Sequence, residues 1–200
     1  MIYKFNIDDK IYDKLVNYSN DVSLLLYNKS LAGNIENEYD IFKYANEIEP
    51  FILQQVTKTK PLFEYFKKLH ILYPKPLPLT INSLWLNRQK KHEFNPIHEH
   101  SGIFSFILFL KIPFTSGEQA QVSPGKNSNN SDRAGKLCFY YIDSEEKGGI
   151  GEKVLDVDKT WERTGLIFKS DLKHAVYPFF TEGERITVSG NLLFNTNVKQ

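Results

Sequence analysis

Two histidines separated by a single residue stand at the start of a strongly apolar segment near the middle of the chain. His98 and His100 precede the apolar run 103–112, and a third histidine, His174, lies far downstream in a second strand-like segment. Alternate side chains of a strand point to the same face, so His98 and His100 are expected side by side. Imidazole ligates several transition metals, and the three histidines therefore predict a metal site. The alternative is that they are ordinary packed or surface residues.

An arginine follows His174 after ten intervening residues. The composition between them predicts a β-hairpin with its turn at residues 181–184, which would carry Arg185 back toward the histidine. The strands of this hairpin are expected at residues 175–180 and 185–194. A guanidinium group is suited to bidentate carboxylate binding, so Arg185 near a metal suits a small carboxylate-bearing co-substrate. The other interpretation is a structural ion pair with Glu182 or Glu184.

Five segments resemble, in order, motifs of the 2-oxoglutarate- and Fe(II)-dependent dioxygenases. They are SLWLNRQ, NPIHEHSGIFSFILFLKIP, GKLCFYYID, TGLIFKSDLKHAVYPF and ERITVSGNLLFN, which together span residues 83–195. The closest likeness is to the prolyl-4-hydroxylase-like branch and its small, often phage-encoded relatives. The resemblance implies a mainly β (α+β) fold, a double-stranded β-helix or jelly-roll core with N-terminal helices packed on it.

The resemblance also implies an activity and roles for these residues. Fe(II) would be held by His98, His100 and His174, and 2-oxoglutarate would chelate the iron and pair its far carboxylate with Arg185. With O2, the co-substrate would be decarboxylated to succinate while a C–H bond of the substrate is hydroxylated. The substrate is unidentified; the resemblance favours a peptidyl proline or another amino acid.

Two strands are expected to line the co-substrate pocket. Alternation puts Ile81, Ser83, Trp85 and Asn87 on one face of the strand 80–88. By resemblance, Asn87 would bind the co-substrate and Trp85 would line its pocket, although Trp85 is equally explained as a core residue. On the last strand, Thr187 and Ser189 share a face and would add hydroxyl donors near the bound carboxylate.

One position departs from the pattern of the family, which usually has an acid two residues after the first histidine. This chain has His100 there. Three interpretations stay open: three histidines bind the metal, the site lacks a ligand, or a bulge turns Glu99 inward. We favour the first. A neutral imidazole leaves the metal centre one charge more positive, so the alternative function is a non-catalytic or cupin-like metal-binding member of the fold.

Composition limits the classes of function. The 200 residues predict one domain, 1–200, and the net charge of +1 offers no field for nucleic acid or anionic membrane. This counts against a nucleic-acid demethylase on the same fold. The single cysteine, Cys138, excludes an internal disulfide and is expected in a buried strand. No segment approaches a membrane span and no secretory signal is seen, so a cytoplasmic location is expected, in the host cell if the protein is phage-encoded. The oligomeric state is left open.

The first part of the chain, residues 1–73, is expected to be mostly helical, and residues 79–200 are expected to form the β-helix core. Asp8 and Asp9 offer N-cap chemistry for a helix through residues 11–27. Further elements expected here are an edge strand at 2–7, two or three helices within 40–70, and an extended linker at Pro74, Pro76 and Pro78.

A long, flexible surface loop is expected within the core at residues 115–135, which are rich in Ser, Asn and Gly and show no apolar period. Such loops often serve as lids or substrate contacts, and the alternative is a tolerated insertion. The strands after it are expected at residues 136–143 and 154–158 and from residue 165, the last delivering His174.

Overall fold

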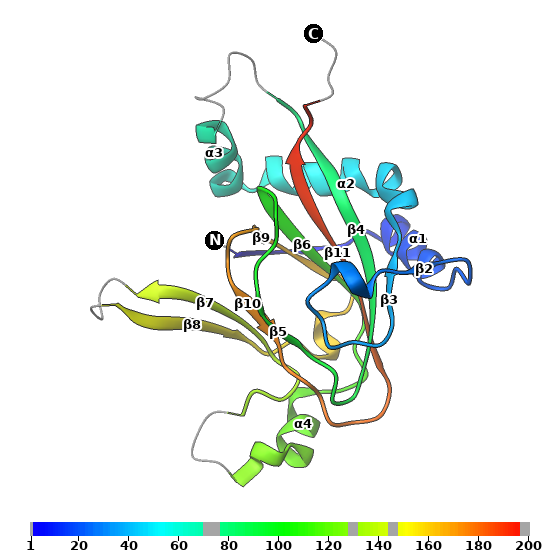
Figure 1. The fold of residues 1–200 in the computed structure, drawn as a ribbon, viewed down its shortest axis with the longest axis vertical. Helices are drawn as coiled ribbons and strands as arrows, with labels where there is room; N and C mark the ends of the chain where they lie inside the picture. Colours follow the sequence, from blue (N-terminus) through cyan, green and yellow to red (C-terminus); the bar gives the residue numbers. More distant parts are fainter. Residues whose placement is uncertain (1, 70–76, 128–131, 144–147, 197–200) are drawn as a thin grey trace.

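Two antiparallel sheets face each other in the computed structural model, which describes residues 2–69, 77–127, 132–143 and 148–196 (Figure 1). The strands of the larger sheet are β1 (Ile2–Asn6), β2 (Leu25–Leu26), β3 (Glu38–Asp40), β4 (Leu79–Lys90), β6 (Phe104–Lys111), β9 (Thr164–Lys169) and β11 (Glu184–Phe194). Those of the smaller sheet are β5 (Asn95–His98), β7 (Leu137–Asp143), β8 (Gly149–Leu155) and β10 (His174–Val176). The helices are α1 (Asp9–Ser19), α2 (Ala45–Lys58), α3 (Lys60–Leu69) and α4 (Ser116–Val122), with short 3-10 turns at Asn28–Ser30, Phe42–Tyr44, Pro124–Asn127 and Lys159–Trp161.

The strand order shows how the chain passes between the two layers. Across the described residues, the larger sheet has the order β1-β9-β6-β11-β4-β3-β2 and the smaller the order β5-β10-β7-β8. Successive strands repeatedly change sheets, as β4 and β5 do, and every pair is antiparallel. This arrangement is a double-stranded β-helix, so the predicted fold class is confirmed. The β7–β8 hairpin extends away from the body of the molecule (Figure 1).

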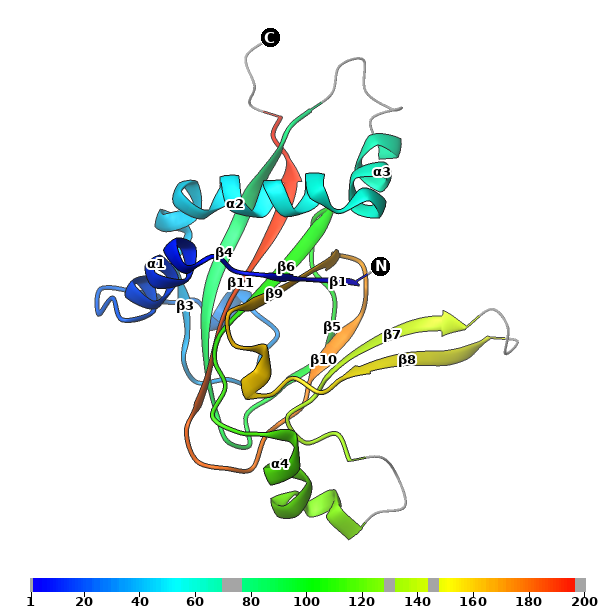
Figure 2. The ribbon, with the colours of Figure 1, turned by 180° about the vertical axis from the view of Figure 1, so that it is seen from behind.

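Alternation along β6 divides the apolar interior into two layers. Phe106 and Leu108 face the helices, whereas Ile107 and Phe109 face the four-stranded sheet. The helical layer is built from α1, α2 and α3, which lie across the outer face of the seven-stranded sheet (Figure 2). Within the described residues, no helix is long and apolar enough to cross a membrane. The inner apolar layer fills only part of the space between the two sheets. Polar side chains line the rest of that space.

The N-terminal helix begins where the sequence predicted and ends earlier. Asp8 Oδ1 accepts a hydrogen bond from the Ile11 amide at 2.9 Å, which is the expected N-cap. The helix stops at Ser19 rather than at residue 27, because the Asp21 carboxylate accepts from the Ser23 amide at 2.8 Å. This side-chain turn competes with the helical hydrogen bonds. The edge strand at 2–7 and the helices within 40–70 are present as β1, α2 and α3. His70, Pro74 and Pro76 lie outside the described residues.

The prediction of a flexible loop over residues 115–135 is wrong for its first half. Thr115 and Glu118 form a reciprocal capping box that starts α4, a signal visible in the sequence as Thr-x-x-Glu. Gln119 then ties the helix to the chain that follows β10, since its amide accepts from the Phe180 N–H at 2.8 Å and donates to Thr181 Oγ1 at 2.9 Å. Residues 128–131 lie outside the described part of the chain.

The sequence also predicted wrongly the bounds of two strands, β8 and β9, and the face of β4 on which Ile81 lies. β8 occupies residues 149–155 rather than 154–158, and β9 ends at Lys169, so a separate strand, β10, carries His174. In β4, Ile81 pairs with Leu192 while Ser83 pairs with Asn191, which leaves one extra residue on β4. This bulge turns Ile81 away from the face of Ser83 and into the helix-side core.

Gly190 provides a direct test of the packing between β4, β11 and β6. A Cβ atom there would lie 2.5 Å from Phe106 Cζ and 2.7 Å from the Ser83 carbonyl oxygen. We expect Gly190→Ala to lower the free energy of unfolding by about 1–3 kcal/mol, measured by urea denaturation. Gly117→Ala is the control, because a Cβ there meets nothing within 4 Å and alanine favours the helix. Equal urea midpoints for Gly190→Ala and the unmodified chain would contradict this packing.

Candidate functional site

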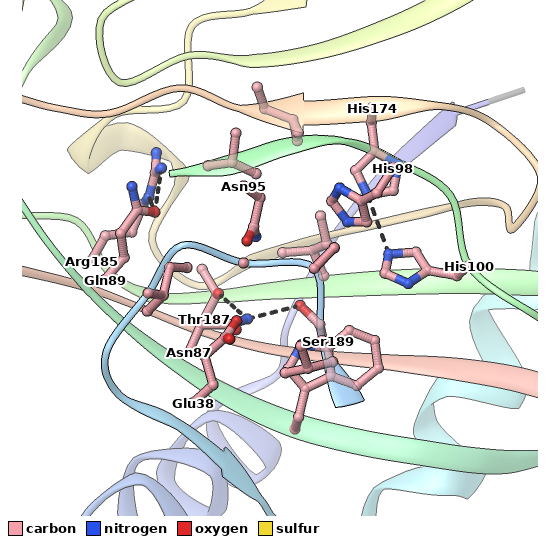
Figure 3. Close-up of a pocket in the computed structure, with 18 of the residues that line it drawn as sticks. Glu38, Asn87, Gln89, Asn95, His98, His100, His174, Arg185, Thr187 and Ser189 are labelled. Atoms are coloured by element: carbon pink, nitrogen blue, oxygen red, sulfur yellow. Dashed lines mark hydrogen bonds between the residues drawn. The ribbon is translucent and has the colours of Figure 1, made fainter. Parts of the chain in front are cut away.

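A cavity of about 180 Å³ lies between the two sheets, and the predicted site residues line it (Figure 3). The small sheet contributes His98 from β5 and His174 from β10. The large sheet contributes inward-facing side chains of β4 and β11. The double-stranded β-helix therefore brings together segments that are far apart in the sequence.

The three histidines converge at one end of the cavity (Figure 3). One ring nitrogen of each lies within 4.8 Å of the others, and His100 Nε2 is 3.2 Å from His174 Nε2. Antiparallel pairing places His98 directly opposite His174. β5 ends at His98, so His100 does not arrive by strand alternation. Its backbone N–H donates to the Ser170 carbonyl at 2.9 Å, and this contact turns the chain so that the ring meets the other two.

The ring orientation of two histidines is fixed by backbone carbonyls. His98 Nδ1 lies 2.7 Å from the Pro96 carbonyl oxygen, and His174 Nδ1 lies 2.9 Å from that of Leu172. A carbonyl only accepts, so Nδ1 carries the proton in each ring and Nε2 presents a lone pair. A hydrogen bond from the second ring nitrogen to a backbone carbonyl is typical of metal-binding histidines.

The electrostatics of the cluster keep the imidazoles neutral. Burial, followed by the neighbouring rings, lowers the pKa of His174 to about 3. Burial, then His98, lowers the pKa of His100 to about 4. The pKa of His98 is lowered by burial as well. Neutral imidazole is the state that binds a metal. Two nitrogens roughly 2.1 Å from a shared metal lie about 3.0–3.4 Å apart at octahedral or tetrahedral angles, which the His100–His174 spacing of 3.2 Å matches.

The acid between the histidines borders the cavity but does not join the histidine cluster. Glu99 Oε2 accepts from Lys173 Nζ at 2.8 Å, and both side chains of this ion pair are more than half exposed. A bulge that would bring Glu99 to the cluster is absent from this described segment, so that interpretation is wrong. The donor set that the structure brings together is His98, His100 and His174.

Arg185 is buried at the other end of the cavity, with 3% of its surface exposed. Its guanidinium donates to Gln89 Oε1 at 2.6 and 3.1 Å, to the Gly135 carbonyl at 2.8 Å and to the Tyr177 carbonyl at 3.3 Å. Every one of these acceptors is neutral. Burial without a counter-ion lowers the pKa of Arg185 to about 9. An uncompensated buried cation is costly, and an anion entering the cavity would relieve that cost.

The structural ion pair considered for Arg185 is not formed. Glu184 lies 3.5 Å from Arg88, and Glu182 pairs with Lys91. Within the described residues, neither carboxylate is left for Arg185. The alternative explanation of Arg185 as part of a structural ion pair with Glu182 or Glu184 is therefore wrong.

The predicted hairpin between His174 and Arg185 is also wrong. β10 ends at Val176 in the four-stranded sheet, and β11 begins at Glu184 in the seven-stranded sheet, without pairing between them. The connection crosses from one sheet to the other, which puts Arg185 on the wall facing β10. Turn composition is the same for a hairpin and for a crossover, so the sequence does not separate the two.

The remaining predicted pocket residues lie along the floor of the cavity. Asn87 and Thr187 are register partners, and Asn87 Nδ2 donates to Thr187 Oγ1 at 3.3 Å and to Ser189 Oγ at 3.5 Å. Trp85 is 5% exposed and its ring centroid is 5.4 Å from that of His100, so it both lines the pocket and packs in the interior. All four side chains face the cavity.

Sequence reasoning missed several polar residues of the cavity, among them Gln89, Glu38 and Asn95. Gln89, which orients Arg185, follows Trp85 and Asn87 on the same face of β4, and simple alternation would have found it. Glu38 on β3 is 1% exposed, and no role could be assigned from the sequence to its segment, LAGNIENEYDI. Burial, then the charge of Glu93, raises the pKa of Glu38 to about 7.

Glu38 should make stability depend on pH in a defined direction. Its pKa rises from 4.5 in the unfolded chain to about 7 in the folded one, so unfolding releases a proton between these values. The free energy of unfolding therefore falls as pH rises through this window, by on the order of 2–3 kcal/mol. We expect Glu38→Gln to remove this fall, measured by urea denaturation at pH 5 and pH 8. Glu36→Gln, at an exposed residue paired with Lys90, is the control that should follow the unmodified chain. If the free energy of unfolding of Glu38→Gln fell between pH 5 and pH 8 as much as that of the unmodified chain, the burial of an unpaired carboxyl at Glu38 would be contradicted.

Comparison with known proteins agrees with this geometry. A family model described as "Putative 2OG-Fe(II) oxygenase" matches residues 83–191. No curated protein matches the chain. Among solved structures, a prolyl-4-hydroxylase from Pseudomonas putida is similar at 12% identity and a TM-score of 0.52, over 97% of this chain and 92% of its own.

Two further structures are similar. HygX from Streptomyces hygroscopicus, solved with nickel, 2-oxoglutarate and hygromycin B bound, has 9% identity and a TM-score of 0.55, over 98% of this chain and 83% of its own. An oxidoreductase of the 2OG-Fe(II) oxygenase family from Burkholderia pseudomallei matches 64% of this chain at 14% identity and a TM-score of 0.42. This chain spans 51% of that protein. At these identities, the prolyl-4-hydroxylase and HygX structures show a shared fold and no more.

Proposed function

Because the chain belongs to the 2OG-Fe(II) oxygenase family of oxidoreductases, whose model matches residues 83–191 of the 200, we propose how this enzyme holds its two cofactors. His98, His100 and His174 bind the Fe(II) on which the family depends. Arg185 binds the far carboxylate of 2-oxoglutarate. Asn87, Thr187, Ser189 and Trp85 line the space between them.

One observation carries this proposal. A single cavity holds a cluster of three neutral imidazoles and, apart from it, a buried guanidinium without a carboxylate partner among the described residues (Figure 3). A dicarboxylate that reaches from the metal to Arg185 would satisfy both groups. Three imidazoles suit iron, and a bidentate guanidinium suits a terminal carboxylate.

The residues of the chain have distinct tasks in such a reaction. Bound Fe(II) supplies the redox chemistry through which O2 and 2-oxoglutarate yield succinate, carbon dioxide and an oxidised substrate. Gln89 accepts from two nitrogens of Arg185 and holds its plane toward the cavity. The hydroxyl groups of Thr187 and Ser189 offer donors along the co-substrate. The apolar side chains of Ile107 and Phe109 line the inner wall and exclude water.

The proposed reaction is hydroxylation of a peptidyl proline or another amino acid. The resemblance to the prolyl-4-hydroxylase-like branch and the shared fold with the Pseudomonas putida enzyme support this substrate class. The partners of the chain are then 2-oxoglutarate and a peptide or small-molecule substrate.

The test is the formation of succinate from 2-oxoglutarate by the purified protein with Fe(II) and O2. We expect succinate to appear with Fe(II) and to stop when a chelator removes the metal. Metal binding without any succinate would instead support the non-catalytic, metal-binding alternative raised by His100.

A further inference from the structure

Glu38 lies in a row of polar side chains that runs across the large sheet. Thr187 on β11 pairs with Asn87 on β4, and Asn87 pairs with Glu38 on β3. All three line the cavity, and Figure 3 shows Glu38 beside Asn87, away from Arg185 and Gln89. The proposed co-substrate occupies the space between the histidines and Arg185. The carboxyl of Glu38 is therefore available to a different ligand.

The carboxyl of Glu38 has no partner in the described part of the chain. Its Oε2 atom is fully buried without a hydrogen bond, and no ion pair of the described residues includes it. Asn87 Oδ1 and Asn95 Oδ1 are also buried and unpartnered, and both residues line the same cavity. Asn95 lies on β5 of the small sheet, and the other two residues lie on the large sheet. Three unsatisfied oxygens that face one cavity are costly unless a ligand brings donors to them.

These three atoms define the chemistry of a ligand that would bind them. An ionised carboxylate only accepts hydrogen bonds, and the two amide oxygens accept as well. A group that is rich in donors and positively charged complements all three. One carboxylate is too little negative charge for a hard divalent ion, which takes six to eight oxygen ligands when it is Ca²⁺. An organic cation fits better.

The segment 30–35 covers the cavity at the place where these oxygens lie. A Cβ atom on Gly33 would lie 2.6 Å from Glu38 Oε1 and close to Asn95 Oδ1, so the backbone of the segment comes down directly onto these oxygens. Hydrogen bonds between the backbones of Asn34 and Phe94, at 2.8 and 3.4 Å, hold the segment in place. The enclosure excludes a bulky group and suits a small head group.

We propose that Glu38, with Asn87 and Asn95, binds an organic cation of the substrate, either a primary ammonium or a guanidinium group. This inference rests on the proposed function, in which Arg185 and the metal neutralise the two carboxylates of 2-oxoglutarate. The charge of Glu38 then remains for the substrate. Within the proposed substrate class, a basic amino acid or another amine is favoured over a neutral peptidyl proline.

The test compares cationic ligands with neutral ligands of the same shape. Protein loaded with Ni(II) and 2-oxoglutarate is titrated calorimetrically with Nα-acetyl-L-arginine against Nα-acetyl-L-citrulline, and with Nα-acetyl-L-lysine against Nα,Nε-diacetyl-L-lysine, so that only the side chain differs in charge. We expect at least one cationic member to bind about tenfold or more tightly than its neutral partner. Glu38→Gln should abolish this preference, because it removes the charge and keeps the shape. Glu36→Gln, two residues away and exposed, should retain it.

Two results would overturn the inference: no charge preference in either pair, or an unchanged preference in Glu38→Gln. Asn95→Asp gives a second variant in case Glu38→Gln folds poorly, and the added carboxylate should strengthen the preference for the cation. The titration of 2-oxoglutarate into the unmodified, Ni(II)-loaded protein distinguishes failure of the proposed function from failure of the role proposed for Glu38. Absence of 2-oxoglutarate binding contradicts the proposed function, whereas normal 2-oxoglutarate binding without a charge preference contradicts only the role of Glu38.

Discussion

His174→Ala is expected to weaken metal binding by at least about a hundredfold. Loss of a residue that merely supports a ligand already costs roughly 10–100-fold in metal affinity, and His174 is proposed as a ligand itself. The residue is 2% exposed, and its Nε2 lies 3.2 Å from that of His100, so alanine leaves a gap that no described carboxylate fills. Anaerobic titration with Fe(II), or titration with Ni(II), measures the loss.

His92→Asn is the matched control for this experiment. His92 is another histidine of the described chain, it is exposed, and it lies outside the cluster. Its backbone has a φ of 69°, a conformation that asparagine tolerates. The metal affinity of His92→Asn should equal that of the unmodified protein. Equal affinities for His174→Ala and the control would remove His174 from the site.

Arg185→Ala is expected to weaken 2-oxoglutarate binding by roughly ten- to a hundredfold. A charge-assisted, bidentate contact contributes about 1.5–3 kcal/mol, which corresponds to that range of affinity. Arg185→Lys should recover only part of the loss, because lysine lacks the planar fork that Gln89 and the Gly135 carbonyl hold in place. Calorimetric titration of the metal-loaded proteins with 2-oxoglutarate measures the three affinities.

Arg88→Ala is the control for Arg185, since Arg88 lies in β4, outside the cavity, and faces Glu184. It should leave the 2-oxoglutarate affinity unchanged. A purely structural Arg185 would lower stability in Arg185→Ala without changing that affinity. Equal affinities for the unmodified protein, Arg185→Lys and Arg185→Ala would therefore exclude Arg185 from co-substrate binding.

Local patterns predicted the elements of this fold well. The alternation in β4, the apolar run that became β6, and the N-cap at Asp8 each depend on residues close in sequence. The capping box at Thr115 and Glu118 was equally local, and it was overlooked because the surrounding composition is polar. The mainly β fold and its N-terminal helices followed from these local signals together with the resemblance.

The site depends on relations that local patterns do not contain. The ten residues between His174 and Arg185 predicted a hairpin, yet the chain crosses from one sheet to the other there. The bulge that turns Ile81 away from Ser83 is visible only in the strand register. Glu38 lines the cavity because β3 pairs with β4, a contact between residues about fifty positions apart. Long-range pairing of this kind is set by the whole fold.

The most direct test of the central claim is a crystal structure of the protein with Ni(II) or Fe(II) and 2-oxoglutarate bound. We expect an anomalous peak about 2.0–2.2 Å from one nitrogen each of His98, His100 and His174. We also expect the far carboxylate of 2-oxoglutarate within hydrogen-bond distance of the Arg185 guanidinium. A metal bound elsewhere, or a co-substrate whose far carboxylate lies away from Arg185, would contradict the proposed function.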